Sequence, residues 1–324
     1  MNITARIIQD SISLHTGTRI TTFELEFPRI ILSQVNTHKM LSKNTSSSRA
    51  IPVTKMLEQI KNNPAMPVHW GKNQSGMQAN EGLNPATALQ AEQYWQGAKN
   101  SAIEHAKVLQ ELGVHKQITN RLTEPFQMVK MIMTSTSYDN FFNLRRHKDA
   151  QPEIYALADA MYQAYMGSKP LELEAGEWHV PYIGRMKGKI RDGEEGVSYI
   201  IKDNSNGKSI FLSVEEAIKI SCSACAQVSY RKLDTSVEKA LEIYDKLAGS
   251  NPIHASSFEH CATPIEYRSK DETKWYVNTV CYPESWQDGI THMDRSGSLY
   301  SGNFKDWIQY RQLIPNHTCW DYKQ

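Results

Sequence analysis

The chain of 324 residues has 36 Lys and Arg residues against 35 Asp and Glu residues, which gives a formal net charge of +1. A balance so close to neutral excludes a global field that would recruit nucleic acid or an anionic membrane, so we expect neither partner. The length allows one large domain or two ordinary ones with a sizeable core.

The N-terminal stretch and the cysteines indicate the compartment. Asp10 interrupts the first apolar segment before it reaches the length of a signal peptide, and no later run approaches the roughly 18 apolar residues of a membrane span. The five cysteines are an odd number spread over a long chain, which is typical of free thiols in a reducing compartment. We therefore expect a cytoplasmic protein.

The first predicted elements are a strand and a short helix. In Thr21–Phe27, apolar residues alternate with acidic ones, which predicts a half-buried strand that Pro28 ends. From Arg29 to Leu41 the apolar spacing predicts a helix, and a serine-rich loop follows it. Pro52 closes that loop before another short helix.

The middle of the chain predicts a long loop, two long helices and a strand. Residues 70–86 are rich in Gly, Asn and Gln without periodicity, which indicates a loop. Thr87–Leu112 has a strong helical pattern, and the apolar run Phe126–Met133 predicts a strand. Asp149–Tyr165 predicts a second helix, with its first residue as the N-cap.

The C-terminal half begins with a segment rich in Gly and charge, residues 183–208, which predicts a boundary or an insertion. Two helical patterns follow, over Ser213–Val228 and Asp234–Leu247. A strand-like run, WYVNTV at 275–280, precedes a Trp- and Tyr-rich stretch that predicts a final helix.

The first motif block runs from the predicted strand into the serine-rich loop, as TFELEFPRIILSQVNTHKMLSKNTSSSR. This stretch resembles the flavin-dependent thymidylate synthase family, in which a similar strand precedes a helix ending in Gln, then Arg-His-Arg and Ser-x-Asn-Glu-x-Ser-x-Arg. Thr37 replaces the first Arg of that pattern, and Thr45 replaces the Glu. The positions that match without a gap are Gln34, His38, Lys39, Ser42, Asn44, Ser47 and Arg49.

A second block, from NRLTEP to AQPEI, is similar to the family's Arg-x-x-x-Pro and Asn-Phe-x-x-Leu-Arg patterns. Thr136 departs from the family, which has a flavin-contacting Arg there. The matching residues are Arg121, Pro125, Asn140, Arg145, Ala150, Gln151 and Glu153.

The third block, CSACAQVSY followed by HASSFEH at 254–260, resembles a pattern that comes first in the ordinary family and comes last here. The chain therefore resembles a circular permutation of the family fold, in the order of a phage-type member. The permutation predicts that His254–Glu259 packs beside the Thr21–Phe27 strand.

The resemblance implies an α+β fold in which a mixed or antiparallel sheet packs with long helices. It implies a single domain over residues 1–324, with its core at about 20–165 and 210–265. An insertion at about 166–210 and a C-terminal extension at about 266–324 complete this division.

The resemblance also implies roles for individual side chains. Arg145 is the expected catalytic residue, because its guanidinium would stabilise negative charge that develops on the uracil ring. No metal is expected. The residues expected to bind dUMP are Gln34, Ser46, Ser47, Ser48, Arg49, Arg121 and Arg145. Those expected to contact FAD are Thr37, His38, Lys39, Thr45, Asn140, His254, Ser256 and Glu259.

The activity that the resemblance implies is FAD-dependent methylation of dUMP to dTMP, with methylenetetrahydrofolate and NADPH as co-substrates. A homotetramer with composite active sites is implied as well, in the host cytoplasm if the protein is phage-encoded. The departures from the family pattern keep two alternatives open. One is a flavin-dependent pyrimidine-nucleotide hydroxymethylase on the same scaffold, and the other is a non-catalytic nucleotide-binding homologue.

Simpler interpretations exist for several of these residues. A run of serines is on its own more often a flexible linker, and the basic residues 145–148 could form a solvated turn. Two His and one Glu within 254–260 could be read as metal ligands. Cys222 and Cys225 form a single CxxC without further zinc ligands, so we interpret them as packing residues of a helix.

Overall fold

A computed structural model describes residues 2–189, 195–202, 207–228, 236–266 and 283–322. Its central element is a mixed sheet, antiparallel except for the parallel pair β1 and β5. This architecture confirms the predicted α+β class. The order of strands across the sheet is β3 (Ser42–Thr45), β4 (Met128–Ser135), β2 (Arg19–Pro28), β1 (Thr4–Ser13) and β5 (Leu171–Leu173).

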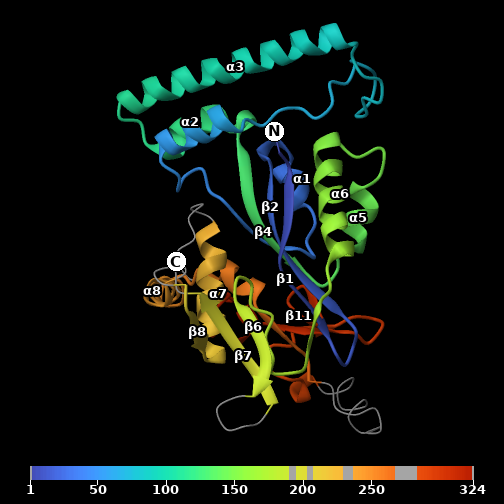
Figure 1. Ribbon diagram of the computed structural model, residues 1–324, viewed down its shortest axis with the longest axis vertical. Coiled ribbons are helices and arrows are strands. Elements are labelled where there is room, and N and C mark those ends of the chain that lie inside the picture. The colour runs from blue at the N-terminus through green and yellow to red at the C-terminus, as the bar shows by residue number, and fades with distance from the viewer. Residues whose placement is uncertain (1, 190–194, 203–206, 229–235, 267–282, 323–324) are drawn as a thin grey trace.

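The alternation that predicted the strand at Thr21–Phe27 gives the sheet two different faces, because successive side chains of a strand point to opposite sides. Phe23, Leu25 and Phe27 are fully buried on the first face, together with Met131 and Met133 of β4. Helices α5 (Asp139–Arg145) and α6 (Pro152–Gly167) cover this face, as Figure 1 shows.

The second face is covered by later parts of the chain. Ile132 of β4 packs against Cys225 of α7 (Val214–Gln227), and Ile20 of β2 packs against Phe304 and Trp307. Ser213 forms a complete capping box with Glu216, so α7 begins where the sequence predicted. Segments that are about 90 to 290 residues apart in the chain therefore share this half of the core.

The segment predicted as an insertion contains a small antiparallel sheet that packs on α7 and on α8 (Val237–Ala248). Figure 1 shows this sheet apart from the main one, on the side of α7. Its strands are β6 (Gly184–Lys189), β7 (Glu195–Lys202) and β8 (Ser209–Leu212).

The remaining helices lie at the end of the main sheet where Figure 1 shows α3 above α2. The predicted helix after Pro52 and the long helix after the loop at 70–86 are both confirmed. The bounds are α2 (Val53–Asn62), α3 (Pro85–Glu111) and α4 (Lys116–Thr119), followed by the 3₁₀ helix η2 (Asn120–Phe126).

Two predictions near the first motif block were wrong. The helix expected over Arg29–Leu41 consists only of a 3₁₀ turn, η1 (Arg29–Ile31), and the short α1 (Leu32–Asn36). The first four residues expected in the serine-rich loop form β3, because β4 supplies ladder partners for Ser42–Thr45. Tertiary pairing here overrides the weak local preference of small polar residues.

Two further predictions were wrong. The N-cap of α6 is Gln151 rather than Asp149, because Pro152 has the backbone geometry of the first helical position. The final helix is replaced by four short strands and the 3₁₀ helix η6 (Tyr310–Leu313); the strand-like run at 275–280 lies outside the described residues. These strands are β10 (His292–Met293), β11 (Leu299–Ser301), β12 (Phe304–Lys305) and β13 (Trp307–Gln309), and β13 pairs with the earlier strand β9 (Ala262–Pro264).

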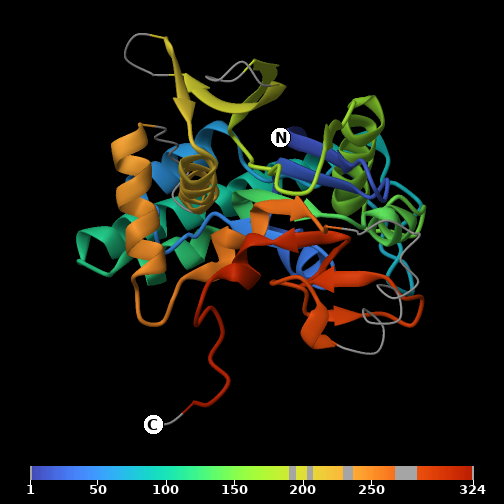
Figure 2. The same cartoon turned by 90° about the horizontal axis from the view of Figure 1, so that it is seen from below.

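The C-terminal strands β10 to β13 are only two or three residues long, which is too short for their burial pattern to specify a helix face. Phe304 and Trp307 are fully buried, and Asp306 between them has a positive φ of 60°. Figure 2 shows these strands, in orange and red, gathered at the end of the molecule seen from below.

Candidate functional site

Two motif blocks meet at His38 and Arg145. His38 follows the end of α1, and Arg145 is the last residue of α5, 107 residues later. Arg145 donates a hydrogen bond from Nε to Nε2 of His38 over 2.9 Å. The His38 ring also packs edge-on against Phe141, with ring centroids 5.0 Å apart. A predicted flavin contact and the predicted catalytic residue are thus in direct contact.

This hydrogen bond fixes the protonation of His38. Because a guanidinium can only donate, Nε2 of His38 must present its lone pair, and a neutral ring then carries its proton on Nδ1. Burial lowers the pKa of His38, and the positive charges of Arg145 and Lys43 lower it further. Within the described part of the chain, the terminal nitrogens of Arg145 make no hydrogen bond and are available to a ligand.

Lys43 lies at the same place, although it matches no position of the family motif. Its ammonium donates a hydrogen bond to the backbone carbonyl of His38 over 2.6 Å. Burial lowers the pKa of Lys43 to about 8, and the charge of Lys39 lowers it as well, whereas Glu259 acts in the opposite direction. Lys43 therefore lies between the end of α1 and the segment that carries Glu259.

Glu259 belongs to the 3₁₀ helix η4 (Ala255–His260), where it forms an ion pair with Arg311 of the C-terminal extension. The Arg311 guanidinium also donates to the backbone carbonyl of His317 over 3.3 Å. His254 and Ser256, the other predicted flavin contacts of this block, are exposed. Residues from three distant parts of the chain thus surround the end of α1.

The C-terminal extension also contacts the first two motif blocks, at Met40, Ser42 and Thr136. Asn303 donates to the backbone carbonyl of Met40 over 3.1 Å and accepts a hydrogen bond of 3.1 Å from the Ser42 hydroxyl. The backbone N–H of Lys305 donates to the hydroxyl of Thr136 over 2.9 Å. Motif spacing alone could not reveal these contacts, because the extension has no counterpart in the motif blocks.

A second set of hydrogen bonds joins the first two motif blocks. The side-chain amide of Gln34 donates to Gln151, and Gln151 donates to the carboxylate of Glu153 over 2.9 Å. Glu153 is buried and also accepts the backbone N–H of Val68 over 3.0 Å. The predicted nucleotide contact Gln34 is thereby held in one orientation.

The serine-rich loop is ordered by the sheet and by η2. Ser46 continues the β3 ladder, with its N–H donated to the carbonyl of Lys130 over 2.8 Å. The side chain of Asn120 donates to the carbonyl of Ser48 over 2.7 Å. Arg49 is exposed at the end of this loop. The loop is therefore a turn held by hydrogen bonds rather than a flexible linker, and the Arg49 guanidinium has no hydrogen bond or ion pair within the described part of the chain.

The predicted nucleotide contacts form two groups in one chain. Arg121 follows Asn120 and so lies beside the serine-rich loop, where it pairs with Glu124 over 2.7 Å. Lys43, beside His38, is separated from Ser47 by roughly 13 Å of extended chain, at about 3.3 Å per residue. Among the described residues, no hydrogen bond or ion pair joins the serine-rich loop to Arg145.

The two remaining predicted flavin contacts occupy less central positions. Asn140 is exposed in the first turn of α5, and Thr45 is half-buried at the end of β3. Thr37 is exposed and donates its hydroxyl to the carbonyl of Gln34 over 2.6 Å, which closes the end of α1. As predicted, Thr37 supplies no charge.

A chain of buried side chains crosses the sheet on its second face. His179 lies 2.9 Å from the Ser11 hydroxyl and 2.8 Å from that of Thr22. Thr22 lies 2.7 Å from Thr134, which lies 2.8 Å from Nδ1 of His260. Through this chain the η4 segment reaches β4 and its neighbour β2, the strand beside which the permutation would place it.

Both histidines of this chain are kept neutral by their surroundings. Burial lowers the pKa of His179 and of His260 to about 3. Nε2 of His260 and the hydroxyl of Ser257 are buried without a hydrogen-bond partner among the residues that the structure describes. The described residues therefore do not offset the cost of removing these two polar atoms from water.

The described cysteines are free, as the sequence predicted. Cys222 and Cys225 are buried on α7, and the sulfur of Cys222 lies 3.6 Å from that of Cys261 without a bond. Across the described ranges, no three His, Cys, Asp or Glu side chains are grouped so that they could hold a metal ion. In the same ranges no helix has the length and apolar character needed to cross a membrane.

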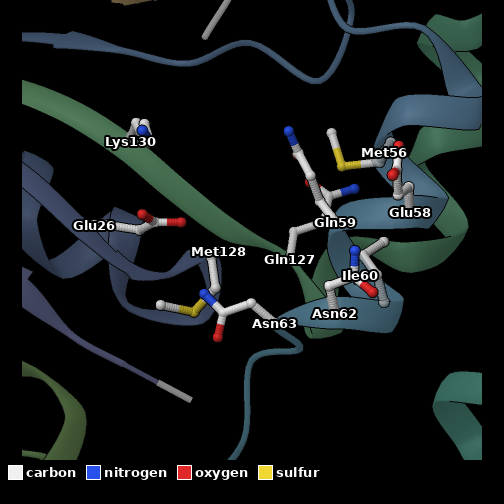
Figure 3. A pocket seen from close by; sticks show the side chains of 10 residues that line it. All are labelled: Glu26, Met56, Glu58, Gln59, Ile60, Asn62, Asn63, Gln127, Met128 and Lys130. Carbon is white, nitrogen blue, oxygen red and sulfur yellow. The ribbon is translucent and has the colours of Figure 1, made fainter.

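A cavity of about 410 Å³ lies between α2 and strands β2 and β4 (Figure 3), and His38 is not among the residues that line it. Glu26 and Glu58 contribute two carboxylates to its wall against the single ammonium of Lys130. This charge balance is unsuited to a phosphate, and the cavity contains none of the predicted site residues. We assign it no role.

The fold is that of an α+β protein in which the first two motif blocks meet through the contact between His38 and Arg145. Residues 18–171, a little under half of the chain, match the family model of thymidylate synthase complementing protein. This match confirms the predicted resemblance to the flavin-dependent thymidylate synthase family over the first two motif blocks. The third block lies outside the matched residues, so the permutation stays a prediction.

Similar solved structures cover about half of the chain. The UMP/dUMP methylase PolB from Streptomyces cacaoi, bound with 5-Br UMP, is 17% identical over 51% of this chain and 88% of its own, with a TM-score of 0.43. The flavin-dependent thymidylate synthase ThyX from Helicobacter pylori, complexed with FAD and dUMP, is 19% identical over 45% of this chain and 67% of its own, with a TM-score of 0.31. No curated protein matches the sequence.

Proposed function

We propose that the protein is a flavin-dependent enzyme that methylates dUMP to dTMP, with methylenetetrahydrofolate as carbon donor and NADPH as reductant. The hydrogen bond between Arg145 and His38 carries this proposal, because it joins the two motif blocks within the segment that matches the family model. A nucleotide and a flavin bound by these blocks would lie next to each other.

The residues around His38 fit an anionic dinucleotide such as FAD. Lys43 and Arg145 place positive charge near the His38 ring, Lys39 adds positive charge near Lys43, and Glu259 is already paired with Arg311. When bound, the flavin would supply the hydride chemistry that no side chain can provide. The protein supplies positive charge and orientation.

In this proposal, Arg145 acts on the uracil ring. With its Nε held by His38, its two terminal nitrogens can present a fork of N–H groups to the carbonyl oxygens of the base. Such donors stabilise negative charge that develops on the ring during the reaction. Gln34, fixed by Gln151, would contact the nucleotide, and Arg49 with Arg121 would bind its phosphate.

We also propose that the active site is composite and is shared between the copies of a homotetramer. The serine-rich loop and Arg145 lie at opposite ends of β3 in a single chain, so the loop of one copy would serve the Arg145 of another. The donor, the reductant and the FAD contacts at Asn140, His254 and Ser256 belong to the same proposal.

The decisive experiment is mass spectrometry of the nucleotide formed from dUMP, methylenetetrahydrofolate and NADPH with FAD-loaded protein. We expect dTMP. A hydroxymethyl product would instead identify the hydroxymethylase, which adds water in place of the second hydride. Colourless protein that cannot be reconstituted with FAD would favour the non-catalytic homologue, which the neutral Thr37, Thr45 and Thr136 suggest. Rescue of cells that lack thymidylate synthesis tests the whole pathway.

A further inference from the structure

The half-buried ammonium of Lys43 has only one hydrogen bond among the described residues, to a backbone carbonyl. Lys43 lies on β3, the edge strand of the sheet, with its side chain half-buried beside the end of α1. Its ammonium can donate three hydrogen bonds, and the carbonyl of His38 accepts one of them. Within the described residues the side chain of Lys43 has no other hydrogen bond and no ion pair, so a half-buried charge lacks an anion.

The charged side chains around Lys43 do not neutralise the positive charge of its ammonium. Lys39 repels its ammonium, and Arg145 adds positive charge at Nε2 of the His38 ring. Glu259 attracts the ammonium, but its carboxylate is already ion-paired with Arg311. The groups contributed by α1, α5, η4 and η6 therefore leave an excess of positive charge at this place.

Burial and the neighbouring cation make the charged form of Lys43 costly, as the fall of its pKa to about 8 indicates. A bound anion would reverse both effects. Thr37 has no charge and directly precedes His38 at the end of α1. The carbonyl of His38 accepts a hydrogen bond from the Lys43 ammonium. Lys43 thus supplies a positive charge at the end of α1, where Thr37 replaces the Arg of the family pattern.

We propose that Lys43 binds a phosphate of the flavin dinucleotide and provides the positive charge that Thr37 lacks. This assignment rests on the proposed function, because it requires that FAD binds beside His38. The phosphate of dUMP is the other possible source of the anion. The serine-rich loop and Arg49 lie at the far end of β3, which favours the dinucleotide for Lys43.

The test compares the affinities of three variants for FAD, riboflavin and dUMP. Lys43→Gln removes the charge, Lys43→Arg keeps it, and Lys55→Gln removes an exposed charge of α2 as the matched control. We expect Lys43→Gln to weaken FAD binding roughly 10- to 100-fold, the range for a charge-assisted hydrogen bond, with a weaker dependence on salt. Riboflavin, which has no phosphate, should bind equally to all variants, and Lys43→Arg should bind FAD almost like the wild type.

Each other outcome contradicts the assignment in its own way. Equal FAD affinity of Lys43→Gln and wild type would exclude a phosphate contact. An equal loss for riboflavin and FAD would mean that Lys43 only holds the carbonyl of His38. A loss confined to dUMP would assign Lys43 to the substrate phosphate. Wild-type protein that binds neither flavin would refute the proposed function itself, and thermal unfolding of each variant identifies loss of folding.

Discussion

Nδ1 of His260 lies 2.8 Å from the hydroxyl of Thr134, although 126 residues separate the two in the chain. This contact connects the η4 segment to a central strand, and it belongs to the buried chain that continues through Thr22 to His179. Because both histidines are neutral in the folded protein, their protonation has to accompany unfolding in acid.

Stability should therefore fall as the pH decreases from about 6.5 towards 3. Over this range a histidine in the unfolded state binds a proton, whereas His179 and His260 do not bind one until the pH approaches 3. Each should lower the free energy of unfolding by about 1.4 kcal/mol per pH unit once the pH is well below 6.5. Urea unfolding at a series of pH values measures this slope.

The variant His260→Gln should remove one of the two histidines that cause the loss of stability in acid. The free energy of unfolding should then change less steeply with pH, and it should be lower at neutral pH. His105→Gln, which changes an exposed histidine of α3, is the matched control. An unchanged slope in His260→Gln would show that His260 is already protonated in the folded protein at mildly acidic pH.

Replacement of Arg145 tests the contact that carries the proposed function. We expect Arg145→Ala to lower kcat about 10²- to 10³-fold, as is typical for the loss of one donor to a developing anion. Arg146→Ala is the control, because Arg146 pairs with Asp159 over 2.9 Å and stacks on Tyr162, away from His38. Steady-state kinetics with FAD-loaded protein would decide. Similar turnover for both variants would remove Arg145 from the reaction.

Mixing two inactive variants tests the composite site. Arg49→Ala and Arg145→Ala should each lose activity, the first because dUMP loses a phosphate contact. If one copy supplies Arg49 and another supplies Arg145, co-expression of the two variants creates some sites with both arginines intact. Activity should then return in the mixture. Its absence in mixed oligomers, verified by mass spectrometry of differently tagged copies, would place both arginines in the same chain.

The buried carboxylate of Glu153 should be important for stability. In Glu153→Gln one acceptor becomes an NH₂ group that faces either the N–H of Val68 or the amide of Gln151. A buried donor left without an acceptor costs about 1–3 kcal/mol, which urea unfolding can resolve. Glu92→Gln, on the exposed side of α3, should change stability little. Equal stability of the two variants would mean that the Glu153 carboxylate is dispensable.

The sequence predicted the parts whose signal is local or depends on fixed spacing. The alternation in β2 and the helical periods of α3 and α7 are such signals. The strand at Ser42–Thr45 could not be predicted, because its reason is the ladder with β4. Lys43 and Arg311 were missed for the same reason, since burial and partner contacts rather than motif position define them.

The contact between the two ends of the chain has a consequence for synthesis. The indole N–H of Trp307 donates to the backbone carbonyl of Thr18 over 3.1 Å, and the hydroxyl of Thr18 donates to Asp306 over 2.6 Å. These pairs are 289 and 288 residues apart, so they can form only after Asp306 and Trp307 have left the ribosome. Until then the second face of the sheet around Ile20 lacks its cover, and the nascent protein depends on rapid closure of this very long loop or on a chaperone.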